Sequence, residues 1–408
     1  MYLRIQCLIG LLCVCSSANA ERVSEASYAY LYTDPYLATT TVGILKDRDH
    51  DWVHDENRYL RLELIGGRND NIPLLEGKGT LRVRYTPTAG PAPLVFVVPG
   101  FGGSAYTGST RYVAQLLSDH GFQVLALPSP FNWNFTLAAS GSGFPGVIRP
   151  DSEDLYRAMQ VALAYIRRHY CAEITGTGLL GLSHGALYAA NVSRLDARQK
   201  KISFDRILLV NPPVDLLRAV RTIDRLAGLK KRYTEKERDD IEAYAAGVAW
   251  QALHRSIDDP GYFAHWDQRL RLDDEQIGYP IGETLRRPLG DSLYAMSLVH
   301  PLEVLNAPIS WGYRSAREEQ AQSFTLFGYL NHILLPWIHR ANGRDLSLEA
   351  LAREGSLKHI APALRDNSKV FLMHNADDFL LSRDDLKLVE ETFRVLMALS
   401  RSGRDFGF

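Results

Sequence analysis

The chain is poor in cysteine and places it unevenly. Of the four cysteines in 408 residues, Cys7, Cys13 and Cys15 fall within the first twenty positions, which leaves Cys171 alone in the remainder. A single cysteine can form neither an internal disulfide nor a cysteine-rich zinc site, so the remainder has neither framework. Because Cys171 follows the aromatic end of an expected helix, we predict a small buried apolar side chain there.

A charge imbalance and long apolar runs are also missing. The 46 Lys and Arg residues nearly balance the 47 Asp and Glu residues, giving a formal net charge of -1. This balance argues against a nucleic-acid footprint and against a polybasic membrane patch. After the first twenty residues no apolar run approaches the roughly 20 residues that span a bilayer. We therefore expect no integral membrane segment beyond the first twenty residues. The expected partners are small molecules.

Several cofactor motifs are lacking as well. The phosphate-loop pattern G-x-x-x-x-G-K-[ST] is absent from the chain. No HExxH motif is present, and no paired-histidine spacing for zinc accompanies His184. The sequence therefore predicts neither a metal nor an organic cofactor.

The first twenty residues have the composition of an export signal. One positive charge at Arg4 precedes an apolar run over residues 7–15, and small residues end the segment at Ala20. This pattern is typical of a secretory signal peptide, so we predict an exported protein, periplasmic or secreted. The alternatives are a buried N-terminal helix and lipoprotein processing at Cys13 or Cys15.

The rest of the chain alternates between strand and helix patterns. Residues 59–64 and 81–85 alternate between apolar and polar side chains, as half-exposed strands do. The later strands are short continuous apolar runs, typical of parallel strands covered on both faces. These runs are residues 94–98, 123–127, 178–182, 207–210 and 370–373. Helices are expected over residues 112–120, over residues 152–170 after a cap at Asp151, and from Ala186. The order predicts an α/β fold with a doubly wound, mainly parallel sheet.

Residues 214–368 interrupt this alternation. Thr234 and Glu237 form a capping-box pattern ahead of an apolar helix over residues 241–253. We predict that the segment forms a helical cap over the edge of the sheet. Its aromatic residues either line a substrate pocket or pack the interior of the cap; they are Tyr244, Trp250, Trp311, Phe327, Tyr329 and Trp337.

Ser183 is the residue most suited to chemistry. It lies in Gly181-Leu182-Ser183-His184-Gly185, which fits G-x-S-x-G and falls between an apolar strand and a helix-prone segment. A serine on such a tight strand-to-helix turn exposes its hydroxyl at the edge of the sheet, and the turn needs small residues on both sides. Ser183 is therefore the predicted nucleophile, the alternative being a serine that caps the following helix.

A glycine-rich loop, residues 99–103, ends the first buried strand. In a hydrolase, backbone N–H groups at this place and just after the nucleophile stabilise the oxyanion. The predicted donors are the amides of Phe101 and His184.

These motifs resemble those of the alpha/beta-hydrolases over residues 94–210 and 370–393. The resemblance implies the chain order serine, acid, histidine, with the acid after a late buried strand. Residues 374–378, His-Asn-Ala-Asp-Asp, are similar to the family pattern H-G-x-x-D, which makes Asp378 the implied acid and Asp377 the alternative. Either aspartate would otherwise cap the helix that starts near Asp384.

The implied histidine does not follow. All twelve histidines lie at or before His374, and Asp405 stands where the family places its histidine. A carboxylate that is ionised at neutral pH is a poor substitute for imidazole, whose pKa near 6.5 suits it to accept and return a proton. Three explanations remain open: an altered or truncated tail, a noncatalytic relative, or a histidine supplied by the cap. The cap candidates are His300, His332 and His339.

Together these observations predict an exported serine hydrolase that cleaves carboxylic esters, as esterases and lipases do. Its predicted substrate is a small ester or acyl compound, and the aromatic residues of the cap favour a hydrophobic one. The alternative is an impaired hydrolase-fold protein that binds a hydrophobic ligand or partner. The expected organisation is a signal peptide (1–20), an N-terminal extension with the first part of the core (21–213), the cap (214–368), and the last part of the core (369–408), which lacks the closing helix.

Overall fold

The computed structural model describes residues 35–36, 39, 57–68, 72–106, 108–258, 271–365, 367–375 and 377–398. The predicted signal peptide and Asp405 lie outside the described residues, as does nearly all of the segment between residues 21 and 56.

The described strands form one eight-stranded sheet, in the order β1-β2-β4-β3-β5-β6-β7-β8. The second strand runs antiparallel to both of its neighbours, and all the other pairs are parallel. The strands are β1 (Arg58–Leu62), β2 (Leu81–Thr86), β3 (Ala92–Val98), β4 (Gln123–Ala126), β5 (Ile174–Leu182), β6 (Arg206–Val210), β7 (Val370–Asn375) and β8 (Arg394–Ala398). The predicted doubly wound, mainly parallel sheet is confirmed.

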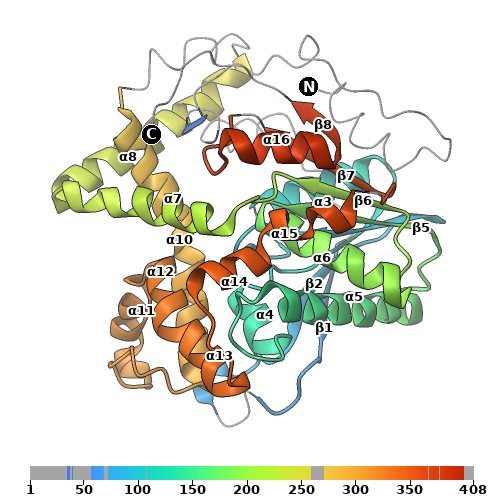
Figure 1. The fold of residues 1–408 in the computed structure, drawn as a ribbon, viewed down its shortest axis with the longest axis horizontal. Helices are drawn as coiled ribbons and strands as arrows, with labels where there is room; N and C mark the ends of the chain where they lie inside the picture. Colours follow the sequence, from blue (N-terminus) through green and yellow to red (C-terminus); the bar gives the residue numbers. More distant parts are fainter. Residues whose placement is uncertain are drawn as a thin grey trace.

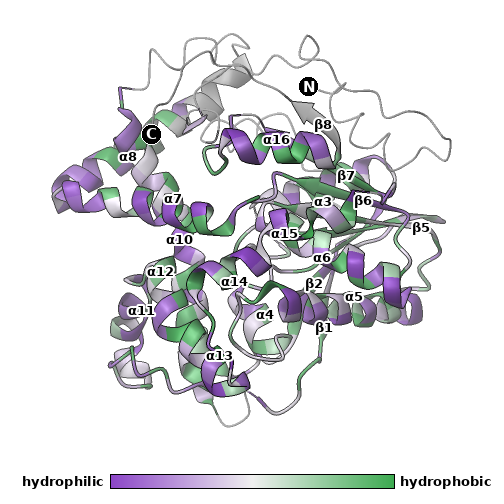
Figure 2. Ribbon diagram, in the orientation of Figure 1, coloured by the Kyte–Doolittle hydropathy of each residue, from purple (hydrophilic) through white to green (hydrophobic). Residues whose placement is uncertain are grey.

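Helices cover both faces of the sheet. In β3, Phe96 packs in the cluster formed with α5 and α6, whereas its neighbours Val95 and Val97 pack in the cluster formed with α3. Alternate side chains of a strand point to opposite faces, so a strand covered on both sides must be apolar throughout. These helices are α3 (Gly108–Asp119), α4 (Trp133–Ala138), α5 (Ile148–Tyr170), α6 (His184–Gln199), α15 (Leu357–Leu364) and α16 (Arg383–Thr392). Figure 2 shows this arrangement: the strands are mostly hydrophobic (green), and the helices that cover them carry hydrophilic residues (purple) on their outer turns.

A run of helices separates β6 from β7 and gathers at one side of the sheet (Figure 1). Its members are α7 (Leu216–Gly228), η3 (Leu229–Arg232), α8 (Glu235–Asp258), α10 (Asp274–Val299), η5 (Trp311–Tyr313), α11 (Arg314–Gln322), α12 (Leu326–Tyr329), η6 (Leu330–Leu334), α13 (Leu335–Asn342) and α14 (Leu348–Gly355). The predicted capping box is present, because the Glu237 side chain accepts from the Thr234 amide and the Thr234 hydroxyl accepts from the Glu237 amide. None of the described helices is long and apolar enough to cross a membrane.

Two local predictions are wrong. Helix α5 begins at Ile148, before Asp151, because Pro150 fits the first turn, where its missing N–H loses no hydrogen bond. Asp151 is therefore inside the helix and almost fully buried, and its carboxylate accepts a hydrogen bond from the Gly146 amide at 2.7 Å. Cys171 is exposed rather than buried: it ends α5 in a left-handed conformation (φ 48°), beyond the helical residues that pack on the sheet.

Candidate active site

Ser183 lies at the turn between β5 and α6 in a conformation that few residues adopt. Its φ is 51° and its ψ is -123°, and its amide donates to the carbonyl of Val210 at 2.7 Å. Backbone strain of this kind costs about 1–3 kcal/mol and persists only where the surroundings enforce it. The Ser183 side chain makes no capping hydrogen bond to α6, so the alternative of a helix-capping serine is wrong.

The two glycines of the motif make this turn possible. A Cβ on Gly185 would lie 2.2 Å from the carbonyl oxygen of Pro99, and one on Gly181 would lie 2.5 Å from the Cα of Ala186. Real Cβ contacts are not this short, so neither position has room for a side chain. Helix α6 therefore packs directly against the backbone at the end of β3.

The glycine-rich loop after β3 lies next to Ser183. A Cβ on Gly100 would be 3.3 Å from the Cβ of Ser183. The loop is held by side-chain and backbone hydrogen bonds: Asn132 donates to the carbonyl of Gly102 at 2.8 Å, and the Gly103 amide donates to the Gly100 carbonyl at 3.0 Å. Among the described residues, no acceptor is assigned to the amide of Phe101. His184 is the first residue of α6, where the backbone N–H has no partner within the helix.

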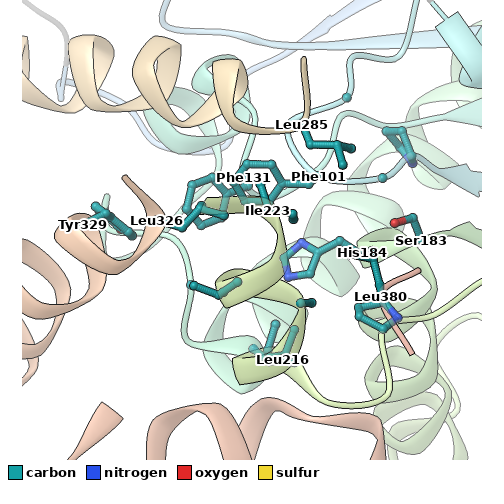
Figure 3. A pocket seen from close by; sticks show the side chains of 18 of the residues that line it. Phe101, Phe131, Ser183, His184, Leu216, Ile223, Leu285, Leu326, Tyr329 and Leu380 are labelled. Carbon is teal, nitrogen blue, oxygen red and sulfur yellow. The ribbon is translucent and has the colours of Figure 1, made fainter. Parts of the chain in front are cut away.

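Ser183 opens into a cavity of about 380 Å³ (Figure 3). Its wall is built by the loop after β3 and the start of α3, which include Ser104, Ser109 and Thr110, by α6, and by mainly aliphatic residues of the helices between β6 and β7. No Asp, Glu, Lys or Arg of the described chain lines it. The aliphatic part of the lining includes Leu216, Val220, Ile223, Leu285, Leu326 and Leu351.

Of the aromatic residues considered for a pocket lining, Tyr329 lines this cavity. Tyr244 and Trp311 are exposed, and Trp337 stacks on Phe144 with ring centroids 5.1 Å apart. Phe327 lies beneath the guanidinium of Arg221. The side chain of Trp250 lies outside the described part of the chain.

His184 projects its ring into the cavity, with the ring nitrogens turned away from the Ser183 hydroxyl (Figure 3). Aromatic rings surround it, with centroids 5.7 Å away for Phe101, 6.4 Å for Phe131 and 4.7 Å for Tyr188. Burial in this apolar setting lowers the pKa of His184 to about 4, because the imidazolium would lose its hydration. The ring is therefore neutral at physiological pH.

Asp378 follows β7, where the resemblance puts the acid. Its side chain is 14% exposed, and one oxygen accepts from the amide of Leu380 at 2.8 Å. Burial raises the pKa of Asp378, although nearby His374 opposes that rise. Leu380 lines the Ser183 cavity, so the loop that carries Asp378 reaches the site.

Neither Asp377 nor Asp378 caps the following helix. Ser382 caps α16, and Asp385 completes the capping box. The predicted alternative role for both aspartates is therefore wrong.

His374, the first residue of the segment that resembles H-G-x-x-D, is a neighbour of Asp378, a contact that the sequence did not predict. Its Nε2 is 3.9 Å from the Asp378 carboxylate and 3.2 Å from the carbonyl of Pro212, and its Nδ1 is 3.0 Å from the carbonyl of Asn375. Its side chain is fully buried. The sequence signal for this contact was the four-residue spacing between His374 and Asp378 at the end of an apolar strand.

The structure brings no cap histidine to Ser183. His332 and His339 are exposed, and His300 packs on Phe144 with ring centroids 4.6 Å apart. None of the three lines the cavity. Within the described ranges, no three His, Cys, Asp or Glu side chains are grouped closely enough to hold a metal ion.

The strand order, with an antiparallel second strand and a sharp turn between the fifth strand and its helix, defines an alpha/beta-hydrolase fold. No protein-family model and no curated protein matches the chain.

Solved structures with this fold are similar to it at low identity. An acylaminoacyl peptidase of Pyrococcus horikoshii is 13% identical with a TM-score of 0.39, and the match covers 86% of this chain but only 38% of the peptidase. A Pyrococcus furiosus esterase is 11% identical with a TM-score of 0.38, covering 86% and 85% of the two chains. A bacterial brefeldin A esterase is 13% identical with a TM-score of 0.36, covering 92% and 81%. Identities and TM-scores this low carry no conclusion about activity.

Proposed function

We propose that the protein is an exported serine hydrolase that cleaves carboxylic esters with a hydrophobic acyl part. The observation that carries the proposal is the strained Ser183 turn, which opens into an apolar cavity beside the Phe101 and His184 amides. Strain of this kind is concentrated at functional sites, because a helix-capping or purely structural serine does not require it.

In this mechanism the Ser183 hydroxyl attacks the ester carbonyl, and an acyl-enzyme forms as the alcohol leaves. The carbonyl oxygen gains negative charge in the transition state, and the Phe101 and His184 amides donate hydrogen bonds to it. Losing one such donor typically costs about 100- to 1000-fold in kcat. Asp378 would orient the histidine that accepts the serine proton and returns it to the departing alcohol. Water would then hydrolyse the acyl-enzyme, which releases the carboxylic acid and restores the Ser183 hydroxyl.

No described residue is assigned as that histidine. His184 turns its ring away from the Ser183 hydroxyl, and no other described histidine lines the cavity. A second candidate function follows from this: the protein binds a hydrophobic ligand in the same cavity without chemistry. The contact of Asp378 with His374, rather than with a histidine at the cavity, favours this alternative.

The proposal of export rests on the first twenty residues alone, with their apolar run and small residues up to Ala20. The N-terminal sequence of the protein recovered from its natural host tests it. An N-terminus at Glu21 supports export, and retention of Met1 contradicts it.

Labelling with a fluorophosphonate probe tests the hydrolase, with Ser183→Ala and Ser193→Ala compared. Ser193 lies on α6, the helix that follows Ser183, but does not line the cavity, so it provides a matched control. We expect labelling of the parent and of Ser193→Ala, and at least about 100-fold less labelling of Ser183→Ala. A folded parent chain that does not label would contradict the hydrolase and favour the binding protein.

A further inference from the structure

The cavity contains one polar side chain that its surroundings do not satisfy. Among the described residues that line it, only His184 has a buried nitrogen or oxygen atom without a hydrogen-bond partner, and that atom is Nδ1. An unpaired polar atom in an apolar setting costs free energy, so such atoms usually have a reason to persist.

The two nearby phenols do not supply a donor to the ring. The Tyr188 hydroxyl donates a hydrogen bond to the Asp151 carboxylate at 3.3 Å. The Tyr329 hydroxyl donates one to the carbonyl of Pro145 at 2.5 Å. The remaining ring neighbours, Phe101 and Phe131, offer only carbon. The imidazole therefore lies between hydrocarbon surfaces and the open cavity.

The protonation state of the ring follows from these contacts. The imidazole is neutral and carries one N–H, which sits on either Nδ1 or Nε2. A buried N–H without an acceptor is rarer in proteins than an acceptor without a donor. We therefore assign the proton to Nε2. The His184 ring lines the cavity, and of its two nitrogens only Nδ1 is buried without a partner, so we infer that Nε2 is the donor open to the cavity.

We propose that His184 Nε2 recognises an oxygen substituent on the acyl part of the ligand, so that the preferred substrates are hydroxyacyl or oxoacyl esters rather than plain fatty esters. The inference rests on the proposed function only for the ester group itself. The rest of the acyl part would lie against the aliphatic side chains of α7, α12 and α14.

The chemistry of the wall limits which substituent fits. A carboxylate or ammonium group would find no opposite charge, because no charged side chain of the described residues lines the cavity and His184 is neutral. A plain alkyl chain would displace any water bound at Nε2 without replacing its hydrogen bond, which lowers affinity. A neutral hydroxyl or carbonyl oxygen meets both conditions.

Binding to the Ser183→Ala protein tests the inference without requiring catalysis. Methyl octanoate is compared by calorimetry with its mono-hydroxylated and mono-oxo isomers. We expect at least one isomer to bind about five- to tenfold more tightly than methyl octanoate, the value typical of one added neutral hydrogen bond. Equal affinity across the set would overturn the inference.

Two further substitutions identify the residue. His184→Phe in the Ser183→Ala background should abolish the preference, and His184→Gln should keep part of it, because its amide can also donate. Leu216→Ala is the matched control, since it removes only apolar contact and should weaken all the esters by a similar factor. A preference that survives His184→Phe would assign it to another residue and overturn the inference.

Nitrogen NMR of His184 provides a readout that does not depend on the His184 variants folding. The Nε2 resonance should shift when the preferred isomer binds to Ser183→Ala and should shift less with methyl octanoate. Absence of that difference would contradict the inference. If the preference is found but the parent chain does not react with fluorophosphonate, the hydrolase proposal fails and the ligand class stands.

Discussion

At the scale of single residues, the site depends on positions where a side chain is excluded as much as on those where one is required. The Ser183 turn holds its strained backbone because α6 lies close against the end of β3. Gly185 lies at the point of contact, and the helix can approach this closely because glycine has no Cβ. The glycine and the serine therefore act together, although the chemistry proposed belongs only to the serine.

Gly185→Ala tests this dependence. The added Cβ would press on the carbonyl oxygens of Pro99 and Val98, at 2.2 Å and 2.4 Å, and backbone cannot move aside as a flexible side chain can. We expect a loss of about 3 kcal/mol or more in unfolding free energy, measured by urea denaturation. Gly247→Ala in α8 is the control: it meets nothing within 4 Å, so we expect a gain of about 0.5–1 kcal/mol. A similar effect of both variants would contradict the close-packing argument.

At the scale of elements, the cavity depends on contacts between helices that lie far apart in the sequence. Asp224 of α7 accepts hydrogen bonds from the amides of Leu326 and Phe327 at 2.9 Å and 2.8 Å. These amides open α12, so the Asp224 carboxylate adds to the cap formed by Thr325, whose hydroxyl accepts from the Gly328 amide at 2.9 Å. Leu326 and Ile223, next to Asp224, both line the cavity. The cap on α12 therefore also fixes part of the cavity wall.

Asp224→Ala should loosen this wall. We expect a loss of about 1–2 kcal/mol in unfolding free energy, faster hydrogen exchange at the Leu326 and Phe327 amides, and weaker binding of esters. Thr234→Ala removes a cap from α8 instead, and Thr234 does not line the cavity. It should cost about 1 kcal/mol and leave ester affinity unchanged. Equal affinity losses in the two variants would indicate a general effect of destabilisation.

At the scale of the whole molecule, two buried groups give folding stability opposite dependences on pH. Burial raises the pKa of Asp151 from 3.8 to about 7, with the Asp154 carboxylate adding to the rise. Between these values the unfolded chain releases a proton that the folded chain keeps, so stability falls as pH rises. Burial lowers the pKa of His184 from 6.5 to about 4, so in that interval the unfolded chain holds the extra proton and stability rises with pH.

The two contributions oppose each other between about pH 4 and 6.5. Asp151→Asn should leave the His184 contribution unopposed, and stability should then rise more steeply with pH than in the parent. In His184→Phe only the Asp151 contribution remains, so folding stability should fall as pH rises. Each slope is at most about 1.4 kcal/mol per pH unit, and the His184 slope is smaller because part of its ring faces the cavity. Urea denaturation across this pH range measures both, and variants with the same pH dependence as the parent would contradict the argument.

The sequence by itself determined the order of the elements and the place of the nucleophile candidate. Apolar runs of four or five residues are typical of strands covered on both faces, and here they recur between helix patterns, which favours strands over buried helix segments. The G-x-S-x-G motif carries its own reason, since the tight turn excludes side chains at Gly181 and Gly185. Helix α10 was not predicted, because Pro280 and Pro288 interrupt its pattern and only packing against α7 and α11 compensates for them.

Only the tertiary structure decided which polar groups meet. Local periodicity does not report what a side chain contacts across the fold, so Asp151 had the pattern of a helix cap and proved to be buried beside Tyr188. For the same reason the contact of His374 with Asp378 was not expected, nor was the ring of His184 in the cavity. The burial that shifts the pKa values of Asp151 and His184 comes from residues far away in the chain, and only the folded molecule supplies it.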